Sequence, residues 1–549
     1  MNSVDYVNKM LDLLNDMTTY ERQPVGSANS EAEKFKKEAR TILRKSAKGK
    51  KLLGLLEEDP RPPRMHGLPK VHKEGLPMRP ITSGIGSAPH RLAKCLAKPL
   101  SSTLGSISGA HLRNSTDLIE RFKTLNFKGK KLASFDVTAL FTNVCVDNAL
   151  EAAKRVIANI SENVLPVPRT DYIRLISLCV KFGSFKFNGS EYRQIKGLAM
   201  GSPLSAVLAC LFMEMLEADK YIGIMGRGTT WLRYVDDVIV VIPRETNVAN
   251  KLRRLNNVNK DIQFTVEMEE EGELPFLDTV IHRADETVKF SVYRKPTNRD
   301  DFIHYFSGHN KRVKTGVLIG FFLRAFRICS KEYLENELSY ITDAFKKLKY
   351  PGGLICKMKN KAKEIYSRSN VQVSEKDKLL YITVPNSMNT ERVDNLLMKG
   401  GLKVAKVSTN RIGKIVKNPC ENSLNDLSVV YRIPCKGCPA SYYGETGRGL
   451  EKRLGEHKND IKAHRTSNSL VQHMNKCGHL PNWNETKVLH QGLKKSMRKT
   501  VEAAYINVNE NNNDREGFIC LSTVASVLVL GEMVKVEHMT DVRRSDVVT

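Results

Sequence analysis

The sequence lacks an apolar run long enough to cross a membrane. Its longest apolar stretches, 316–323 and 524–530, are shorter than the roughly 18 residues that a spanning helix needs. The N-terminal segment, Met1 to Asp5, also lacks the positive residues and the apolar stretch of a secretory signal. These absences predict a soluble, intracellular protein without a membrane partner.

The cysteines show no disulfide framework. There are 11 of them, an odd number, and most stand alone in apolar runs, as Cys179 and Cys210 do. This distribution is typical of reduced, buried thiols inside a cell. Only Cys435 and Cys438 are spaced as a pair.

Acidic residues are scarce relative to basic ones. The chain has 60 Asp and Glu against 87 Lys and Arg, which leaves a net charge of +27. A polyanionic partner is the simplest reason for such an excess. Because the basic residues are scattered and no amphipathic anchor or lipidation motif accompanies them, we expect nucleic acid rather than a membrane surface.

The sequence does contain enough apolar material for several folded domains. Hydrophobic residues make up 41% of the 549 residues and charged residues 27%, which is a globular balance. Spacing and composition predict five parts: an N-terminal helical region (1–60), an α+β region (61–300), a basic helical region (301–370), a Lys-rich linker region (371–425) and a C-terminal unit (426–549). We expect a polar break between helices near 23–29, and short α/β segments at 379–384 and 392–398 in the linker.

Two strand-like segments carry acids suited to metal chemistry. The segment 132–137 is a β-type run that contains Asp136, and 231–241 has apolar flanks around Asp236 and Asp237. The second pattern predicts a β-hairpin with its acids at the turn. If the two segments lie side by side, Asp136 and Asp236 can share two Mg²⁺ ions, the arrangement used for nucleotidyl transfer.

A turn rich in glycine and proline lies between these acids. It runs from Gln194 to Ser205 and leads into an apolar helix expected over 206–216. Gly197 and Gly201 allow a close approach of the backbone to a nucleotide and template. An ordinary loop before a helix is the alternative.

Taken in order, Asp136, the 194–205 block and the Tyr234-Val-Asp-Asp segment resemble motifs A, B and C of reverse transcriptases. The resemblance implies that Asp136 and Asp236 are the Mg²⁺ ligands, that Asp237 is an accessory acid and that Tyr234 lies near the primer end. It also implies that Gln194, Gly197 and Gly201 contact nucleotide or nucleic acid. Phe141 matches the family's steric gate, which selects deoxynucleotides; the alternative is a plain core residue.

Further blocks resemble the Penelope-like retroelements. The segments 66–73 and 78–81 are similar to the fingers of that family, where Lys70 and Arg79 would hold triphosphate or template phosphates. The segment 274–278 resembles the strand after the active-site hairpin, and 292–297 the element that grips the primer, with Lys295 as a contact. The resemblance implies an α+β, right-hand polymerase with fingers and palm over 61–300 and a helical thumb over 301–370. Its partners would be an RNA template, a DNA primer or target and deoxynucleoside triphosphates.

The C-terminal unit carries a second set of chemical groups. Residues 429–446 predict a short hairpin with Cys435 and Cys438 at its turn. Arg453 and His457 are four residues apart and share one face of a predicted helix. With the downstream acid Glu502 they could cut a phosphodiester: Arg453 would stabilise the phosphorane, Glu502 would hold one Mg²⁺, and a Tyr or His would help to activate water.

This pattern resembles the small α/β GIY-YIG endonucleases, with Tyr431 and Tyr442 as the two tyrosines. Val429 and Tyr443 depart from the family pattern. The family's late asparagine matches Asn512 or Asn513, and the register between the two stays open.

A metal site is predicted beside this hairpin. Cys435 and Cys438 have zinc-ligand spacing, and His473 and His479 follow downstream. Similar Cys-Cys-His-His sets occur in the GIY-YIG domains that this unit resembles, which implies a structural Zn²⁺. Cys477 could replace either histidine, and free thiols beside surface histidines are the alternative.

Together the resemblances predict an RNA-directed DNA polymerase of a retrotransposon, primed at a DNA nick made by its own endonuclease domain and acting on chromosomal DNA in the nucleus. The alternatives are a non-catalytic nucleic-acid-binding descendant, a telomerase-like terminal reverse transcriptase and an RNA-synthesising polymerase. The oligomeric state, the template RNA, the target DNA and the mobility of this copy stay open.

Overall fold

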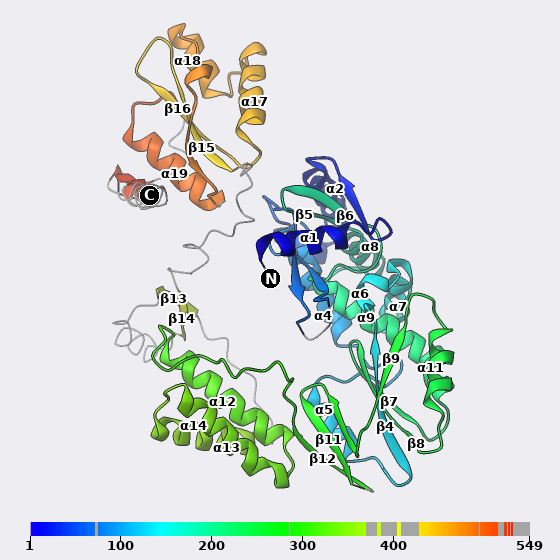
Figure 1. Ribbon diagram of the computed structural model, residues 1–549. Coiled ribbons are helices and arrows are strands. Elements are labelled where there is room, and N and C mark those ends of the chain that lie inside the picture. The colour runs from blue at the N-terminus through cyan, green and yellow to red at the C-terminus, as the bar shows by residue number, and fades with distance from the viewer. Residues whose placement is uncertain are drawn as a thin grey trace. The chain divides into compact units, whose positions relative to one another are not determined.

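The computed structural model describes residues 2–71, 75–284, 286–368, 381–385, 403–407, 428–493, 495–513 and, in part, 521–530. The chain divides into two compact units, Met1–Val416 and Lys417–Thr549 (Figure 1). Among the described residues, no helix combines the length and apolar character needed to cross a bilayer.

A five-stranded sheet with the order β1-β6-β5-β2-β3 opens the first unit. Its strands are β1 (Tyr20–Gln23), β2 (Arg64–Pro69), β3 (Met78–Ser83), β5 (Ser184–Phe187) and β6 (Ser190–Gln194). Helix α1 (Ser3–Leu14) packs its Met10 and Leu14 against this sheet. Helices α2 (Ser27–Leu43) and α3 (Ala47–Leu52) and the short 3₁₀ turn η1 (Leu53–Leu55) complete this part.

Strand β1 corrects the expectation of helices interrupted only by a polar break. Its residues pair with β6, with Tyr20 opposite Gln194, and the Tyr20 ring packs edge-on against Phe185 at 5.9 Å. The strand therefore depends on partners about 170 residues away, which no local pattern reveals.

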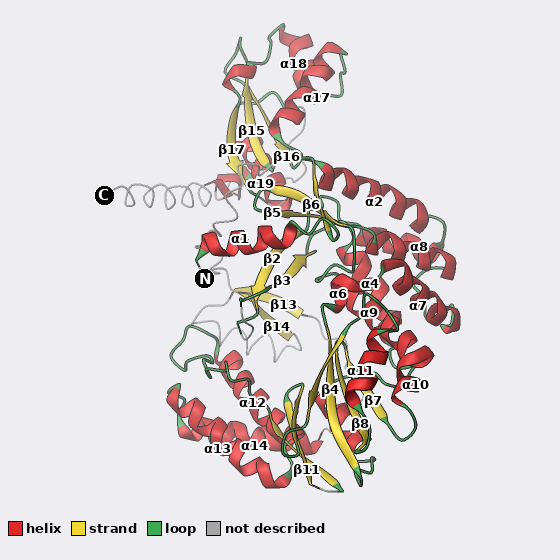
Figure 2. Ribbon diagram, turned by 45° about the vertical axis from the view of Figure 1, so that its right-hand side comes forward, coloured by secondary structure: helices red, strands yellow, loops and turns green. Residues whose placement is uncertain are grey.

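A four-stranded antiparallel sheet with the order β7-β8-β4-β9 forms the centre of the first unit. Its strands are β4 (Lys130–Val137), β7 (Thr230–Tyr234), β8 (Asp237–Pro243) and β9 (Phe264–Met268). Both faces are buried: Phe135 joins a core shared with helices, and Leu132 joins a second core shared with the next sheet. The helical layer contains α4 (His90–Ser101), α7 (Val146–Asn159), α8 (Arg169–Val180) and α9 (Pro203–Leu216) (Figure 2).

Helix α9 begins at Pro203, three residues before the predicted start. Proline is favoured at the first helical position because it has no amide hydrogen to leave unpaired. The π-helical turn η2 (Glu217–Tyr221) and α10 (Ile222–Met225) continue from α9. The other short helices of this region are α5 (Ser115–Phe122), α6 (Leu140–Asn143) and α11 (Val248–Asn256).

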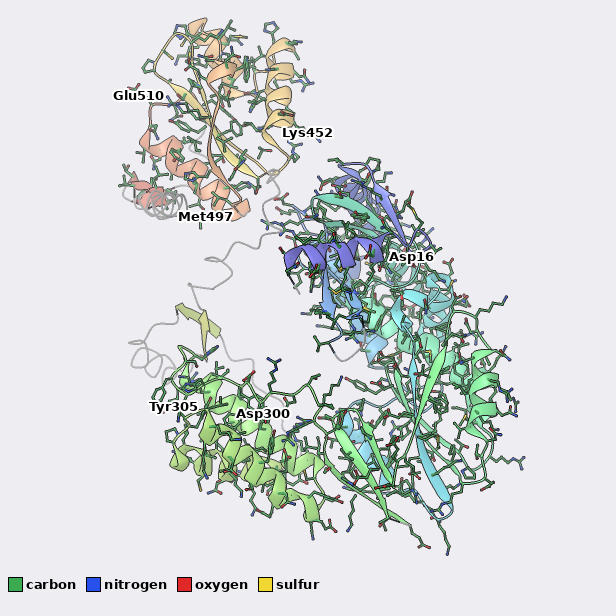
Figure 3. The ribbon with its side chains drawn as sticks, viewed as in Figure 1. Asp16, Asp300, Tyr305, Lys452, Met497 and Glu510 are labelled. Atoms are coloured by element: carbon green, nitrogen blue, oxygen red, sulfur yellow. The ribbon has the colours of Figure 1, made fainter. Side chains whose placement is uncertain are left out.

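A three-stranded sheet and three helices follow in this unit. The strands are β10 (Glu273–Phe276), β11 (Thr279–Ala284) and β12 (Thr287–Val292), and the helices are α12 (Lys311–Ile328), α13 (Lys331–Lys347) and α14 (Gly352–Arg368). The helices share a core that includes Leu318, Phe322 and Phe345. Figure 3 labels Asp300 and Tyr305 in the segment before α12.

In the predicted linker, β13 (Tyr381–Pro385) pairs in parallel with β14 (Lys403–Val407). The short α/β segment predicted at 379–384 overlaps β13, while the one predicted at 392–398 lies outside the described residues.

The second unit has a sheet with the order β16-β15-β17. Its elements are β15 (Val429–Pro434), β16 (Ser441–Thr446), α17 (Leu450–Lys462), α18 (Ser469–Cys477), η4 (Trp483–Glu485), β17 (Lys487–Gln491) and α19 (Lys495–Val508). The hairpin of β15 and β16 sets Tyr431 opposite Gly444 and Tyr442 opposite Ile433.

Candidate active sites and metal site

The three acids of the central sheet come together through strand pairing. Asp136 near the end of β4 lies opposite Asp237 at the start of β8. The next amide, that of Val137, donates a hydrogen bond to the carbonyl of Asp236 at 3.0 Å. The sequence prediction required Asp136 to lie near this turn, and the backbone places it there.

The turn that carries Asp236 has an unusual backbone. Tyr234 and Asp237 pair directly, which leaves Val235 and Asp236 as the two turn residues. Val235 has a φ of +57°, a left-handed conformation that costs a β-branched residue energy and persists only where its surroundings impose it. Tyr234 is 37% exposed on this turn.

The acids repel one another. Burial raises the pKa of Asp237 to about 6, and the charges of Asp236 and Asp136 add to the shift, while Lys295 and Arg79 oppose it. A group of carboxylates that resist simultaneous ionisation fits a site whose charge is balanced by bound cations. The donor set therefore fits Mg²⁺, a hard ion that prefers carboxylate oxygens.

The glycines between the acids serve this chain's own backbone. A Cβ on Gly197 would lie 2.5 Å from the carbonyl oxygen of Thr142, and one on Gly201 would lie 2.2 Å from that of Thr82. Both glycines have positive φ, +81° and +125°. Both glycines thus let the turn pack closely against α6 and β3, and their predicted role in the approach of a nucleotide stays a prediction.

Phe141 lies on α6, beside this turn. Its carbonyl accepts a hydrogen bond from the amide of Leu198 at 2.6 Å, and its half-buried ring packs on the main core. The Gln194 side chain donates to the carbonyl of Lys196 at 2.9 Å, so in this structure it shapes the turn.

The predicted phosphate-binding residues lie on neighbouring elements. Arg79 is exposed on β3 opposite Leu68, and the amide of Lys70 closes the same hairpin by donating to Pro77 at 3.0 Å. Lys295 is exposed after β12. The adjacent Arg294 is fixed by Glu337 at 2.6 and 2.8 Å, which holds the segment against α13.

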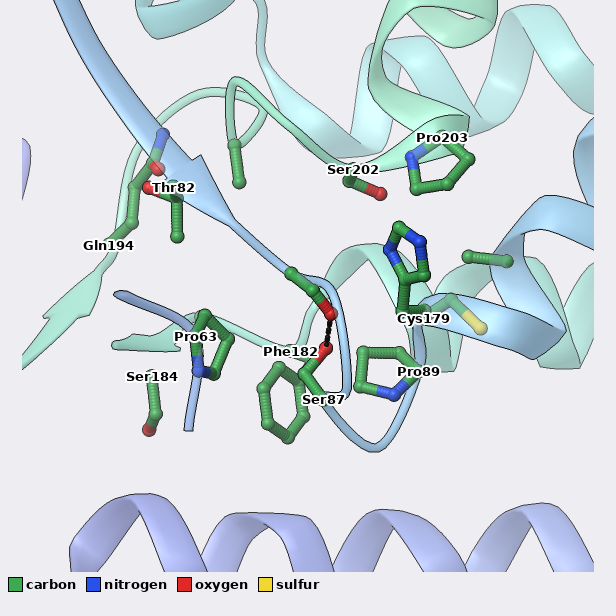
Figure 4. Close-up of a pocket in the computed structure, with 15 residues that line it drawn as sticks. Pro63, Thr82, Ser87, Pro89, Cys179, Phe182, Ser184, Gln194, Ser202 and Pro203 are labelled. Carbon is green, nitrogen blue, oxygen red and sulfur yellow. Dashed lines mark hydrogen bonds between the residues drawn. The ribbon is translucent and has the colours of Figure 1, made fainter. Parts of the chain in front are cut away.

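A small cavity lies beneath the glycine-rich turn (Figure 4). Gln194, Ser202 and Pro203 line it together with Thr82, and its volume is about 40 Å³. Ligand pockets measure roughly 300 Å³ or more, so this cavity is a packing gap and too small for a nucleotide. Ser87 closes one side by donating to the carbonyl of Gly84 at 2.6 Å.

In the second unit, four elements bring the predicted nuclease residues together. The hydroxyl of Tyr431 on β15 lies 2.9 Å from Nε2 of His457 on α17, and the rings of Tyr442 and His457 are 5.1 Å apart. Arg453 and Glu502 lie near enough to influence the pKa of both tyrosines, which burial raises.

The hydrogen bonds of His457 define its protonation. The Asn468 carbonyl oxygen accepts from the amide of Leu470 at 3.1 Å, so its amino group faces Asp460 at 3.0 Å and Nδ1 of His457 at 2.9 Å. Nδ1 is therefore an acceptor, and Nε2 carries the hydrogen that it donates to Tyr431. Burial, followed by the charge of Arg453, lowers the pKa of His457 to about 4, so the ring is neutral at pH 7.

Glu502 on α19 is the buried acid of this site. Burial, followed by the charge of Glu445, raises its pKa to about 7. Its Oε2 is buried and has no hydrogen-bond partner within the described part of the chain. An orphaned buried carboxylate oxygen fits the prediction that Glu502 holds a divalent cation.

The late asparagine lies at the edge of the same sheet. Asn513 pairs with the backbone of Tyr443 through both of its side-chain atoms, at 3.0 and 2.8 Å. Asn512 instead contributes its amide, which donates to Ser441 at 3.2 Å. Asn513 is therefore the residue whose side chain fastens this strand.

The four predicted zinc ligands form one cluster. The ligand atoms of Cys435, Cys438, His473 and His479 all lie within 4.8 Å of one another. Nε2 of His473 is 3.3 Å from Sγ of Cys435 and 3.6 Å from Sγ of Cys438. Cys477, the alternative ligand, is exposed and outside this cluster. Two thiols and two imidazoles fit a tetrahedral metal site.

Several supporting residues escaped the sequence prediction. Asn468 fixes the tautomer of His457, and Glu456 accepts from Arg453 at 2.8 Å and from Arg448 at 2.9 Å. Arg453 and Glu456 are three residues apart on a helix, and this spacing alone predicts the contact between them. For Asn468 the chain offers no such signal, because the contact crosses from α17 to the start of α18.

Comparisons with known proteins agree with the first site. The family model for reverse transcriptase (RNA-dependent DNA polymerase) matches residues 78–269, a range that contains all three acids. A second model, the animal helix-turn-helix domain, matches residues 301–358, which span α12, α13 and the start of α14. No curated protein sequence matches the chain.

Among solved structures, telomerase from Candida albicans with a fragment of telomeric RNA is 10% identical, with a TM-score of 0.45, and the match covers 68% of this chain and 66% of that one. Apo telomerase from Candida tropicalis truncated from its C-terminal domain is 13% identical, with a TM-score of 0.34 and coverage of 42% and 55%. The chain thus spans just under two thirds of these relatives or less. Likenesses this distant carry no information on activity, whereas the family match shows that the chain contains a reverse transcriptase domain.

Proposed function

We propose that this chain copies an RNA template into DNA and that its C-terminal unit is a GIY-YIG-type endonuclease that cuts the DNA used as primer. The observation that carries the proposal is the pairing of Asp136 with Asp237, which gathers three acids within the reverse transcriptase domain. The substrates are an RNA template, a DNA primer or target and deoxynucleoside triphosphates. The enzyme acts on chromosomal DNA in the nucleus, as expected for a Penelope-like retroelement.

In the polymerase site, Asp136 and Asp236 would hold the Mg²⁺ ions, with Asp237 as an accessory acid. Bound Mg²⁺ would activate the primer 3′ hydroxyl and neutralise charge on the triphosphate. Arg79 and Lys295 lie near enough to Asp237 to lower its pKa. Their positive charges would attract the triphosphate and the primer backbone. Exposed Tyr234 meets the primer end.

Phe141 would exclude the sugar 2′ hydroxyl. We expect Phe141→Ala to admit ribonucleotides, with discrimination falling about 10- to 100-fold, since a lost steric contact is worth roughly 1–3 kcal/mol. The measurement is single-nucleotide incorporation of dNTP against the matching rNTP. Unchanged sugar choice would favour an RNA-synthesising polymerase.

In the nuclease site, Arg453 would stabilise the negative phosphorane and Glu502 would hold one Mg²⁺. Both ring nitrogens of His457 already form hydrogen bonds within the protein. Of the tyrosines and the histidine that were predicted to help activate water, the tyrosines would therefore do so. Tyr431 stays a neutral phenol because burial raises its pKa, and with Tyr442 it would orient the attacking water. Zn²⁺ held by the Cys435 cluster would be structural.

The test uses the full chain with Mg²⁺ on a DNA primer annealed to an RNA template, and separately on duplex DNA. Asp136→Ala should abolish extension, by about 10³-fold or more if metal binding is lost, and leave nicking intact. Arg453→Ala should do the reverse, with a loss of about 10²- to 10³-fold. Wild-type extension no higher than that of Asp136→Ala would instead favour a non-catalytic nucleic-acid-binding protein.

A further inference from the structure

Directly behind the catalytic turn lies a buried ion pair that no motif accounts for. Arg233 and Glu217 are both fully buried, and Nε of Arg233 is 2.5 Å from Oε1 of Glu217. Arg233 is the last residue but one of β7, and Glu217 is the first residue of the π-helical turn η2. Single π-helical turns inside α-helices are rare and are frequently found at functional sites.

Each end of this pair reaches a different element. Nη1 of Arg233 donates to the carbonyl of Val235 at 3.0 Å, and Nη2 donates to the carbonyl of Cys210 on α9 at 3.1 Å. The carboxylate of Glu217 accepts from Trp231 Nε1 at 3.1 Å and from Ser108 Oγ at 2.8 Å. The guanidinium therefore connects the helix after the glycine-rich turn to the catalytic turn itself.

The contact with Val235 matters because that residue holds the turn in its left-handed conformation. The strained backbone needs a partner that over-determines it. The planar, fork-shaped guanidinium can bind a carboxylate and two carbonyls at once, which a lysine ammonium at the same place cannot do with the same geometry. Its charge is balanced by Glu217, so the pair can stay buried.

We propose that Arg233, held by Glu217, is a positioning residue that fixes the carbonyl of Val235 and thereby aims Asp236 and Asp237 at Asp136. Arg233 does not touch substrate or metal. The inference rests on the proposed polymerase activity, and it goes beyond that activity by naming what holds the acids in place.

Two variants separate positioning from plain stability. Arg233→Met with Glu217→Met removes the bond to Val235 without leaving a buried charge, and such exchanges of a buried pair are often neutral for folding. Arg233→Lys keeps the charge and a partner for Glu217 but loses the fork. The control is Glu214→Gln. Glu214 is a buried acid on α9 that accepts hydrogen bonds from the amides of Gly105 and Ile107.

The experiment measures kcat and KM for dNTP in primer extension, and Mn²⁺ affinity by electron paramagnetic resonance, in full-length protein carrying Glu502→Gln to silence the nuclease site. We expect kcat to fall about 100-fold in both Arg233 variants, as for a misplacement of catalytic groups by about 1 Å. KM should change less than about threefold, and Mn²⁺ affinity should fall several-fold, with the control unchanged.

Wild-type kcat and Mn²⁺ affinity in either variant, once folded, would overturn the inference. A fall of kcat in proportion to the folded fraction, measured by thermal melting, would also overturn it, because the pair would then be structural only. If the wild-type chain binds Mn²⁺ through Asp136 but extends no primer, the proposed function fails. The Mn²⁺ affinities of the variants still decide the role of Arg233.

Discussion

The proposed polymerase site and the proposed nuclease site are assembled in two different ways. In the central sheet, the register of the strands puts Asp136 opposite Asp237, where burial and then the charges of Asp236 and Asp136 raise the pKa of Asp237. In the second unit, His457 is held by Asn468 on one side and Tyr431 on the other, and the site depends on contacts between side chains of separate elements.

The difference shows where each site is vulnerable. Backbone pairing in the four-stranded sheet survives the loss of a functional side chain, so acid substitutions there should remove activity and leave the fold intact. The proposed nuclease site belongs to a small unit, in which one buried apolar cluster of the described residues contains Val429, Tyr431, Ile433 and Leu470. Small domains of this kind often need a staple, and the Cys-His cluster can supply one.

The largest expected effect comes from removing one ligand of the Cys-His cluster. Cys438→Ser should destabilise the second unit by at least about 4 kcal/mol, because metal binding energy is folding energy in such sites. The chain has 2 tryptophans, one in each unit, so Trp231→Phe leaves Trp483 to report on this unit. The readout is Trp483 fluorescence during urea unfolding, with bound zinc measured by atomic absorption.

The matched control is Cys477→Ser, an exposed cysteine outside the cluster. It should keep both the zinc and the unfolding midpoint. A loss of zinc in Cys477→Ser as large as in Cys438→Ser would show that the ligand set differs from the four clustered residues.

The next effect is a pH dependence in the second unit. His457 has a folded pKa of about 4, below its unfolded value of about 6.5. As the pH falls, His457 therefore binds a proton in the unfolded chain before it does so in the folded chain. The free energy by which the neutral, buried His457 stabilises the second unit is complete above pH 6.5 and is lost as the pH falls toward 4. Its size is up to about 3 kcal/mol by linkage.

The measurement is the unfolding midpoint of the Trp483 transition between pH 4 and 7, compared with His457→Gln. Loss of a metal from the Cys-His cluster at low pH would affect both proteins, so the difference between them isolates His457. Parallel curves for the two proteins would contradict the assigned burial and tautomer.

The smallest expected effect is a change in the stability of the first unit. Gly201→Ala should destabilise the first unit by about 2 kcal/mol or more, since the new Cβ meets a backbone carbonyl and the φ of +125° suits glycine. Gly223→Ala, on α10 with nothing within 4 Å, should be neutral or stabilising by up to about 1 kcal/mol.

Trp231 fluorescence in a Trp483→Phe background reads this unit. Equal midpoints for Gly201→Ala and Gly223→Ala would mean that the turn moves away from Thr82, and the seating of the glycine-rich turn on β3 would then be wrong.

Much of both sites could be predicted from local sequence, because the signals are local. The apolar residues on both sides of Asp236 predict the hairpin around it. The four-residue spacing of Arg453 and His457 predicts that they share one face of a helix. Residues that act across distant segments left no such trace: Arg233 looks like one more strand residue, and its partner Glu217 like one more helical acid. The packing of Gly201 left no local signal either, because the carbonyl that excludes a side chain there belongs to Thr82.

By itself, the sequence determined the acids, the glycine-rich turn, the tyrosine pair and the spacing of the Cys and His ligands, since these depend on residue type and short-range geometry. Only the tertiary structure decided that β1 is a strand, that Asp136 faces Asp237, that His457 donates to Tyr431 and that Cys477 lies outside the metal cluster. Such contacts join segments far apart in the chain, and their energies arise only when both partners are already in place.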